Sequence, residues 1–333
     1  MAPSALPHVV VVAMGGTIAG SASSATDATG YRAGTASVEA LLAAVPEAAG
    51  LATLSGEQFA NMDSSDLTDE LMLGVARRIG ELLDDPAVDG VVVTHGTDTL
   101  EETAYFLHLV LGSTKPVVLV GSMRPASALS ADGPMNFYAA VAAASAAASS
   151  GRGVLVVLND EIHTARDVTK TTSLSVASFA SPYGPLGVVV GGRALYYRAV
   201  ARPHTTHTEF SLAAIDSLPR AGIIYAHSGL DDTVSRLIES AGYDVIVHAG
   251  FGNGTVASRI VAPLEAARAS GTVIVRATRT GSGHVTAVGA SGDRVDGWIS
   301  VDDQNPQRAR ILACLALTVT RDPLEIQRIF DTY

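Results

Sequence analysis

The segment VVVTHGTDTLEETAYFL, residues 91–107, joins an apolar run to a helix-forming stretch through a short polar turn. The β-branched run predicts a strand over Val88–Thr94, and the pattern that follows predicts a helix over Thr99–Leu111. Strands that alternate directly with helices are typical of a parallel sheet covered on both faces. The segment therefore indicates an α/β fold, with a polar turn at the carboxyl end of one strand.

The same alternation of apolar runs and Ala/Leu-rich stretches recurs along the chain. The other elements predicted in the first half are strands His8–Met14, Pro116–Gly121 and Gly153–Asn159 and helix Pro134–Ser149. Those predicted in the second half are strands Gly222–Ala226, Asp244–Ala249 and Thr272–Ala277 and helices Asp231–Ala241, Thr255–Ala269, Pro306–Val319 and Pro323–Phe330. We expect two three-layer α/β domains with mainly parallel sheets: a larger N-terminal one over residues 1–202 and a smaller C-terminal one over 222–333, joined by a linker over 203–221.

Composition and charge limit the class of protein. Of the 333 residues, 47% are hydrophobic and 17% are charged, which is typical of a folded globular chain. The formal net charge of −11 disfavours nucleic acid and anionic membranes as partners, because both attract basic patches. Cys314, the single cysteine, lies in an apolar helical pattern and is expected to be buried.

The sequence carries no recognisable transport or membrane signal. The opening MAPSALPH lacks a charged segment followed by an apolar one and leads straight into a strand. No apolar run reaches the roughly 18 residues that a membrane span needs. We therefore expect a soluble protein and favour the cytoplasm, with a mature exported form as the alternative.

Polar residues follow several of the predicted strands. Thr17 follows the first strand within the sequence GGT, Thr97 and Asp98 follow the second, and Ser122 follows the third. Ligands of open parallel sheets bind beyond the carboxyl ends of the strands. Two threonines and an aspartate at one sheet edge point to a hydroxyl nucleophile with charged helpers.

These residues also have structural interpretations. Thr97 and Asp98 stand at a helix start, where the segment Thr99–Glu102 fits a capping box. A histidine at a strand end, such as His95, is more often packed and hydrogen-bonded than catalytic. Lys170 is either a solvated lysine or a group placed against Asp98 that tunes or accepts a proton.

Two further motifs resemble binding sites only weakly. HAGFGNG, residues 248–254, follows a strand and opens a helix, but Thr255 replaces the third glycine of a dinucleotide-binding turn. His204 and His207 have metal-like spacing but lie in the predicted linker. The sequence contains neither a P-loop motif nor the nucleophile elbow of serine hydrolases.

MGGTIAG and VVVTHGTDTLEETAYFL closely resemble the two signature segments of the bacterial-type L-asparaginase family, with a spacing most like that of the type II enzymes. The similarity continues in order through GEQFANMDSSDLTD, KPVVLVGSMRPASALSADGPMN, GVLVVLNDEIHTARDVTKT, YGPLG, HAGFGNG and NPQRARILACLALT, and so covers nearly the whole chain. The resemblance implies an amidohydrolase of asparagine catabolism that converts L-asparagine to L-aspartate and ammonia. It also implies that the reaction uses no metal or organic cofactor.

The resemblance further implies a role for each catalytic residue. Thr17 is the expected nucleophile, and Tyr31, carried by a mobile lid over Gly20–Gly30, helps to take its proton. An acyl-enzyme on Thr17 is the working hypothesis, and direct attack by a positioned water is the alternative. The second catalytic cluster, which assists the nucleophile or the water, is expected to consist of Thr97, Asp98 and Lys170.

Substrate contacts follow from the same resemblance. The α-carboxylate is expected at Ser64 and the backbone of Ser65, and the α-ammonium at Asp98, beside Thr97. Ser122 matches a position whose backbone lines the side-chain amide pocket. The last expected contact is Asn253, which matches a residue that reaches the site from a neighbouring subunit. We therefore expect a homotetramer built as a dimer of dimers.

Two positions depart from the family pattern. Type II members often supply a glutamate from the adjacent subunit to the substrate ammonium, and a gapless comparison places Ala290 there. Either Asp293 or Asp296 substitutes for it, or Asp98 alone recognises the ammonium. Ser65 stands where many members carry a glutamine, and we expect this change to weaken L-glutamine hydrolysis.

Other functions fit a two-domain α/β protein with this site. Related amidases are a glutaminase-asparaginase and a glutamyl-tRNA amidotransferase subunit, of which the second predicts an extra N-terminal domain and a basic face. A non-catalytic amino-acid-binding protein would bind aspartate or asparagine without releasing ammonia. Such a protein has no need of two activated threonines, so the sequence favours the enzyme.

Overall fold

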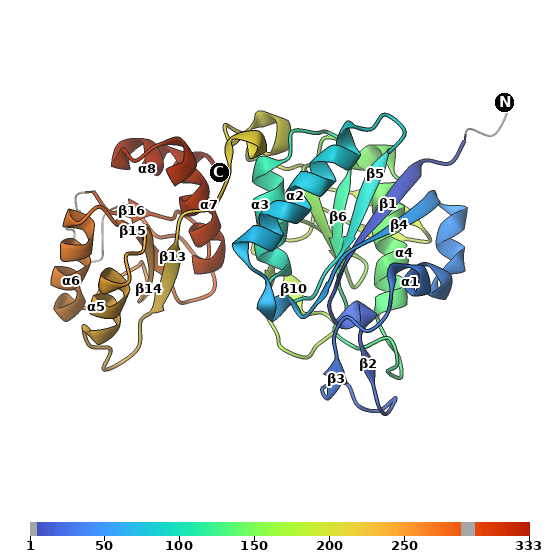
Figure 1. The fold of residues 1–333 in the computed structure, drawn as a ribbon, viewed down its shortest axis with the longest axis horizontal. Helices are drawn as coiled ribbons and strands as arrows, with labels where there is room; N and C mark the ends of the chain where they lie inside the picture. The colour runs from blue at the N-terminus through green and yellow to red at the C-terminus, as the bar shows by residue number, and fades with distance from the viewer. Residues whose placement is uncertain (1–4, 288–296) are drawn as a thin grey trace. The chain divides into compact units, whose positions relative to one another are not determined.

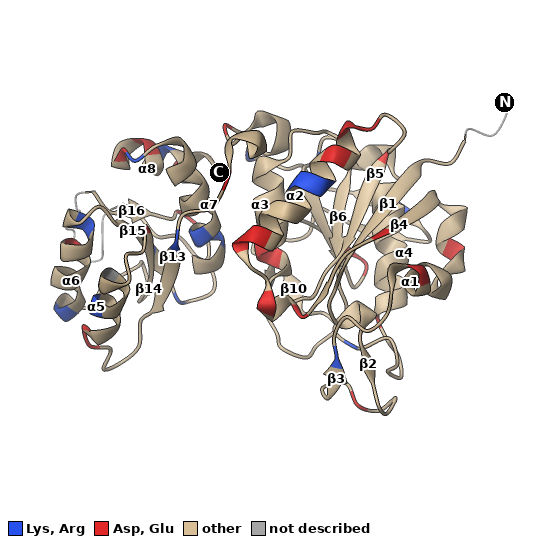
Figure 2. Ribbon diagram, in the orientation of Figure 1, with Lys and Arg blue, Asp and Glu red and all other residues tan. Residues whose placement is uncertain are grey.

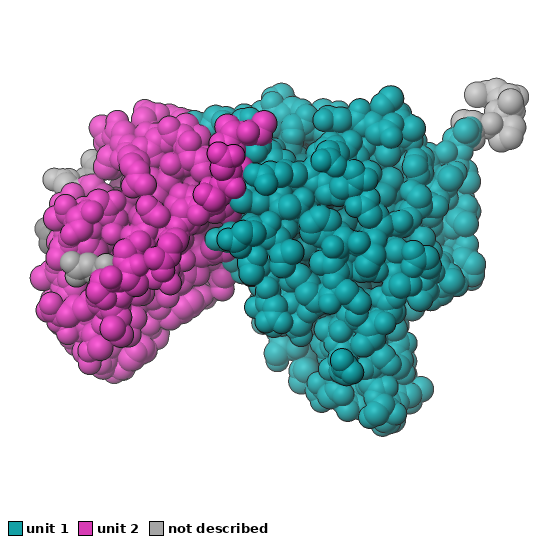
Figure 3. Space-filling view, in the orientation of Figure 1, with its two compact units in different colours: residues 1–212 teal, residues 213–333 magenta. Residues whose placement is uncertain are grey.

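The computed structural model describes residues 5–287 and 297–333. The chain divides into two compact units, Met1–Leu212 and Ala213–Tyr333 (Figures 1 and 3). Each unit has its own sheet, which helices cover on both faces. The prediction of an α/β fold with mainly parallel sheets is thus confirmed.

Eight strands form the sheet of the first unit, in the order β12-β11-β8-β7-β6-β5-β1-β4. The neighbouring strands β7, β6, β5, β1 and β4 are parallel, whereas β8, β11 and β12 form an antiparallel edge. Their bounds are β1 His8–Gly15, β4 Thr53–Met62, β5 Gly90–Thr94, β6 Val117–Val120, β7 Val154–Leu158, β8 Glu161–Thr164, β11 Gly187–Val190 and β12 Arg193–Tyr196.

The register of the parallel strands brings their carboxyl ends to one edge. Ala13 of β1 lies beside Thr94 of β5, and Thr94 lies beside Val120 of β6. Thr17, Thr97 and Ser122 follow these positions by a few residues each. The sheet therefore sets the starting points of the three loops that carry Thr17, Thr97 and Ser122.

Helices cover both faces of this sheet, whose central strands carry apolar residues on both faces. Val9 and Val11 pack into the cluster that includes α1 and α4, and the alternate residues Val10 and Val12 are also buried. Helices α2 and α3 pack against β5 and β7 (Figure 1). The helices are α1 Val38–Ala44, α2 Asp69–Asp84, α3 Leu100–Val110 and α4 Gly133–Ala144.

Charged residues of both signs lie along the exposed side of α2 (Figure 2). Arg78 contacts Glu57 of β4 at 2.8 Å and Glu81 one turn further along α2 at 2.7 Å. These partly exposed pairs contribute little to stability, since water screens them. They link α2 to the edge strand and mark the solvent face of this layer.

In the described part of the second unit, four parallel strands form a sheet in the order β13-β14-β15-β16. Helices α5 and α6 cover one face around a core that includes Ile246, Leu264 and Ile274, while α7 packs against β13, β14 and β15. The elements are β13 Ala221–Tyr225, α5 Thr233–Ser240, β14 Val245–Gly250, α6 Ser258–Ala269, β15 Val273–Thr278, β16 Ile299–Ser300, α7 Pro306–Val319 and α8 Pro323–Thr332. Cys314 is buried in α7, as predicted.

Sequence patterns did not predict the edges of the large sheet. β4 is an edge strand with mostly half-exposed or exposed residues, so its sequence TLSGEQFANM lacks an apolar run. Asn159 and Asp160 have φ values of 50° and 64° and form the two-residue turn between β7 and antiparallel β8. The helix predicted over Pro134–Ser149 ends at Ala144, and a 3₁₀ turn follows.

None of the helices in the described ranges combines the length and apolarity that crossing a bilayer requires.

His95, His108 and His163 are buried in the first unit. Loss of water lowers the pKa of His95 to about 4, that of His108 to about 3 and that of His163 to about 4. A histidine in the unfolded chain has a pKa near 6.5. Between about pH 6.5 and pH 4 the unfolded state therefore binds more protons than the folded state, and acid destabilises the fold.

We expect His95→Gln to flatten the pH dependence of stability. In the wild type we expect this ring to lower the free energy of unfolding by about 1–2 kcal/mol when the pH falls from 7 to 5. The free energy of unfolding, measured by urea titration at both pH values, gives the slope. His227→Gln, at an exposed position in the second unit, is the control. Equal slopes in wild type and His95→Gln would contradict the assignment.

Candidate active site

A cleft of about 230 Å³ opens at the carboxyl edge of the large sheet. It lies within the first unit, and most of its polar lining consists of hydroxyl groups. The lining residues are Thr17, Ala28, Thr29, Tyr31, Thr97, Asp98, Ser122, Met123, Lys170, Ser173 and Leu174. Six of them were candidates from the sequence, and they come from loops that are far apart along the chain.

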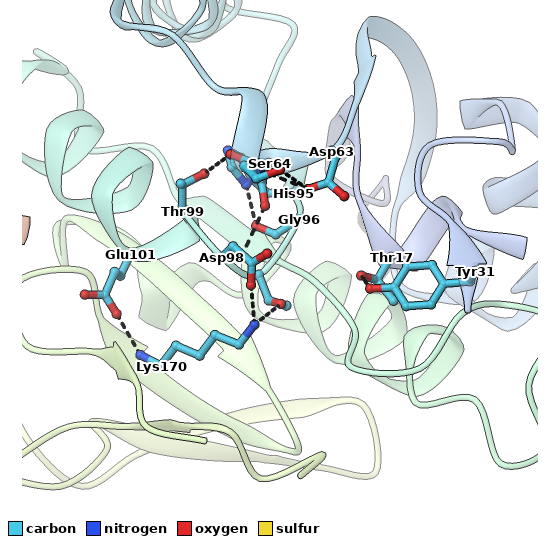
Figure 4. A network of polar contacts seen from close by, with 12 residues as sticks. Thr17, Tyr31, Asp63, Ser64, His95, Gly96, Asp98, Thr99, Glu101 and Lys170 are labelled. Carbon is cyan, nitrogen blue, oxygen red and sulfur yellow. Dashed lines mark hydrogen bonds and ion pairs between the residues drawn. The ribbon is translucent and has the colours of Figure 1, made fainter. Parts of the chain in front are cut away.

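Thr17 and Tyr31 form a hydroxyl pair on one side of the cleft. Thr17 starts the 3₁₀ turn after β1 and is nearly buried, and its Oγ1 lies 2.7 Å from the phenolic oxygen of Tyr31 (Figure 4). One of the two hydroxyls donates to the other. A proton can therefore pass between them without an intervening group.

Tyr31 is held by a small hairpin. β3 (Tyr31–Arg32) pairs with β2 (Ser21–Ala22), so Ala22 lies opposite Tyr31, and the Ala22 N–H donates to Ser127 Oγ at 2.8 Å. Asp27 Oδ1 accepts the N–H of Gly30 at 2.6 Å, which closes the turn and lowers the pKa of Asp27. The tract predicted to be a mobile lid thus contains a hydrogen-bonded hairpin over residues 20–32.

Glycines let the loops after β1 and β5 touch through their backbones. Gly16 has a φ of 78°, and a Cβ there would lie 2.4 Å from the Cα of Gly96. A Cβ on Gly96 would in turn lie 2.5 Å from Ser64 Oγ. No larger residue fits at either position without moving the backbone. This contact brings Thr17 and Thr97 to the same cleft.

Lys170 lies across the cleft from the hydroxyl pair (Figure 4). Its Nζ donates to Thr97 Oγ1 at 2.8 Å and to Asp98 Oδ1 at 2.6 Å. The lysine side chain is 18% exposed and that of Asp98 is 60% exposed. Of the two interpretations that the sequence left open, the structure therefore supports the lysine placed against Asp98.

Ser64 and Ser65 lie beside the cleft without lining it in the described structure. Ser64 is buried, and its Oγ accepts the N–H of Asp98 at 3.2 Å. Ser65 directs its N–H and its hydroxyl to Asp63 Oδ1, at 3.0 and 2.9 Å. The hydroxyl of Thr99 donates to the Ser64 carbonyl at 2.9 Å, so the predicted capping box does not form.

His95 and Ser122 differ in their access to the cleft. The His95 ring is buried, with Nδ1 2.7 Å from the Gly96 carbonyl and Nε2 3.0 Å from the Thr103 hydroxyl. Nδ1 therefore carries the proton and Nε2 accepts, which leaves no ring nitrogen for substrate. Ser122 lines the cleft, and its hydroxyl donates to the Arg124 carbonyl at 2.8 Å.

Asn253 belongs to the second unit, on the turn after β14. Its side-chain amide donates to the Thr286 hydroxyl at 2.9 Å and accepts the Thr286 N–H at 2.8 Å. Ala290, which stands at the position of the family glutamate, lies outside the described residues, as do its suggested substitutes Asp293 and Asp296.

The histidines with metal-like spacing pack into a row of rings. His204 lies 5.1 Å from His108 and 6.5 Å from His207 between ring centroids. Across residues 5–287 and 297–333, no group of three or more His, Cys, Asp or Glu side chains is arranged to hold a metal ion.

Sequence reasoning missed the position of Glu101. It entered only as part of a capping box, but its carboxylate is buried and accepts the backbone N–H of Lys170 at 2.7 Å. No sequence signal indicates this contact, because 69 positions separate the two residues.

The chain is similar to known proteins over nearly its whole length. Residues 8–202 match the family model described as asparaginase, N-terminal, and residues 220–330 match the glutaminase/asparaginase C-terminal domain. The chain is 45% identical to the glutaminase-asparaginase of Pseudomonas fluorescens biotype A over 98% of its own length and 91% of the relative's. It is 45% identical to L-asparaginase 2 of Escherichia coli strain K12, over 99% of this chain and 94% of that one.

A solved structure, a probable cytoplasmic L-asparaginase from Campylobacter jejuni, superimposes with a TM-score of 0.95. It is 43% identical, and the match covers 98% of this chain and all of that one. The two family models together span most of the 333 residues. The resemblance of the signature segments is thus confirmed, and the chain belongs to the asparaginase family.

Proposed function

We propose that the protein hydrolyses L-asparagine to L-aspartate and ammonia, with Thr17 as the nucleophile. The observation that carries the proposal is the 2.7 Å contact between Thr17 Oγ1 and the Tyr31 hydroxyl, in a cleft that also holds Thr97, Asp98 and Lys170. Relatives named L-asparaginase and glutaminase-asparaginase support the choice of an amide substrate.

The first step forms an ester and releases ammonia. Thr17 Oγ1 attacks the side-chain amide carbon of asparagine while its proton passes to the phenolic oxygen of Tyr31, which releases its own proton towards the amide nitrogen. We assign the developing oxyanion to backbone N–H groups near Thr17 and Thr97, and such a donor contributes roughly 3–4 kcal/mol. The carbon–nitrogen bond then breaks, and the nitrogen leaves as ammonia with the proton that Tyr31 releases.

The second step consumes water. Thr97, whose hydroxyl accepts from Lys170 Nζ, orients a water that attacks the ester carbon. The carbon–oxygen bond to Thr17 breaks, aspartate leaves, and a proton returns to Thr17 Oγ1. The alternative is a single step in which the same water attacks the amide directly.

Substrate recognition uses the charged rim of the cleft. Asp98 is more than half exposed and can receive the α-ammonium while its Oδ1 stays bonded to Lys170. Ser122 lines the cleft, and by similarity to the family its backbone is the proposed lining of the amide pocket. By similarity to the family, Ser64 and Ser65 remain the proposed partners of the α-carboxylate.

We further propose a homotetramer in which Asn253 completes a neighbouring site, and domains over residues 1–202 and 222–333 with the linker between them. For the compartment we propose the cytoplasm, which is the location in the name of the Campylobacter jejuni relative, with an exported mature form as the alternative.

We expect Thr17→Ala and Thr97→Ala each to lower the rate of ammonia release from L-asparagine by roughly 10³-fold or more, because each removes a hydroxyl that reacts or orients water. Thr17→Ser should keep part of the activity. Mass spectrometry of acid-quenched wild type and Thr97→Ala should detect an ester on Thr17. Turnover without such an adduct would favour direct attack by water, and aspartate binding without any ammonia release would identify a binding protein.

Tyr31→Phe should lower kcat by roughly 10²–10⁴-fold and change KM much less, because it removes only the phenolic oxygen and keeps the ring. Tyr197→Phe is the matched control, since Tyr197 is exposed and does not line the cleft. A kcat in Tyr31→Phe equal to that of the wild type would rule out proton transfer through Tyr31.

Ser65→Gln should raise the ratio of L-glutamine to L-asparagine hydrolysis by about tenfold. The serine directs both of its polar groups to Asp63, whereas a longer amide can extend towards substrate. Ammonia release from each amide by purified wild type and variant measures the ratio. If the wild type already hydrolyses both amides at comparable rates, the role assigned to Ser65 is wrong.

A further inference from the structure

The strand that carries Lys170 lies outside the large sheet. β9 (Thr169–Lys170) pairs with β10 (Phe179–Ala180) in a two-stranded ribbon. Thr97 and Asp98, in contrast, follow β5 in the middle of the eight-stranded sheet. The hydrogen bonds of the large sheet therefore do not set the position of Lys170 relative to its two partners.

Glu101 supplies the missing connection. It lies in the first turn of α3, it is 5% exposed, and its Oε2 accepts the backbone N–H of Lys170 at 2.7 Å (Figure 4). The same oxygen accepts the Thr169 hydroxyl at 2.6 Å. Both bonds lie in a buried setting, where hydrogen bonds are stronger than in water.

These contacts connect both ends of Lys170 to one short segment of the chain. Glu101 comes three residues after Asp98, so helix α3 and the turn before it hold both carboxylates on one continuous segment. Asp98 and Thr97 bind the ammonium end of Lys170, and Glu101 binds its backbone. The lysine is thus fixed at both ends by residues of the same short stretch.

We propose that Glu101 is a positioning residue for Lys170: it sets the distance from the lysine backbone to the hydroxyl of Thr97. This role rests on the proposed function, in which Lys170 and Thr97 orient the attacking water. What matters is an acceptor oxygen at the right place, since one oxygen takes both bonds. Glutamine presents such an oxygen at the same reach, whereas aspartate is one methylene shorter.

The kinetic test compares three substitutions. We expect Glu101→Asp and Glu101→Ala to lower kcat for L-asparagine by roughly 10- to 100-fold with KM within about threefold, because small displacements of reacting groups slow the reaction strongly. Glu101→Gln should stay within about threefold of the wild type. Glu70→Ala is the matched control, since Glu70 lies in the first turn of α2 and is exposed.

A direct measurement of Lys170 separates positioning from general damage to the fold. The chain has two lysines, Lys115 and Lys170, so lysine-labelled protein gives two sets of side-chain NMR signals. Lys115 donates to the carbonyls of Leu83 and Asp85, both at 2.7 Å, and Lys115→Arg assigns its signal. In Glu101→Asp and Glu101→Ala we expect the Lys170 signal to shift or broaden while that of Lys115 stays unchanged.

The outcomes distinguish this inference from the proposed function. If the wild type releases no ammonia but the Lys170 signal moves in Glu101→Asp, the positioning role stands and the proposed function fails. If the wild type is active and Glu101→Asp retains both its kcat and its Lys170 signal, the positioning role is wrong. Equal movement of both lysine signals, or a loss in Glu101→Gln as large as in Glu101→Ala, also overturns it.

Discussion

The close approach of two backbones, at Gly16 and Gly96, is the constraint on which the site depends. The loops after β1 and β5 leave neighbouring strands, so side chains at these positions would push them apart. Without a Cβ at either position, the loops meet, and Ser64 packs against the second glycine. Glycine at these positions makes folding lose more conformational entropy, because the unfolded chain is more flexible there. In return, the loops that carry the two threonines start from neighbouring strands of one sheet and meet at one cleft.

The two halves of the cleft are supported differently. Thr97 and Asp98 follow a central strand and lead directly into α3, so they inherit the rigidity of the large sheet. Tyr31 and Lys170 lie on two-stranded ribbons outside the large sheet, and local hydrogen bonds, among them those from Ala22 to Ser127 and from Lys170 to Glu101, connect these ribbons to the rest of the unit. The site therefore combines Thr97 and Asp98, which the large sheet positions, with Tyr31 and Lys170, which local contacts position.

The sequence predicts those parts of the fold that are uniformly apolar. Val91, Val92 and Val93 read as a buried strand because both faces of β5 are covered. β4 could not be predicted in this way, because this edge strand is partly exposed to solvent and its sequence pattern resembles that of a loop. Six of the residues that line the cleft were expected from their places after the strands or from the family signatures. Glu101 could not be found, because its partners are brought to it only by folding.

The scarcity of lysine has a practical consequence for covalent chemistry. One of the two lysines lies in the cleft, and the other donates to two carbonyls at the end of α2. Reagents that acylate amines therefore find few targets on this protein, and Lys170 is one of them. Immobilisation or polymer conjugation through amines would compete directly with the contacts to Thr97 and Asp98. Exposed carboxylates outside the cleft, such as that of Glu70, offer an attachment chemistry that avoids the ammonium group of the site.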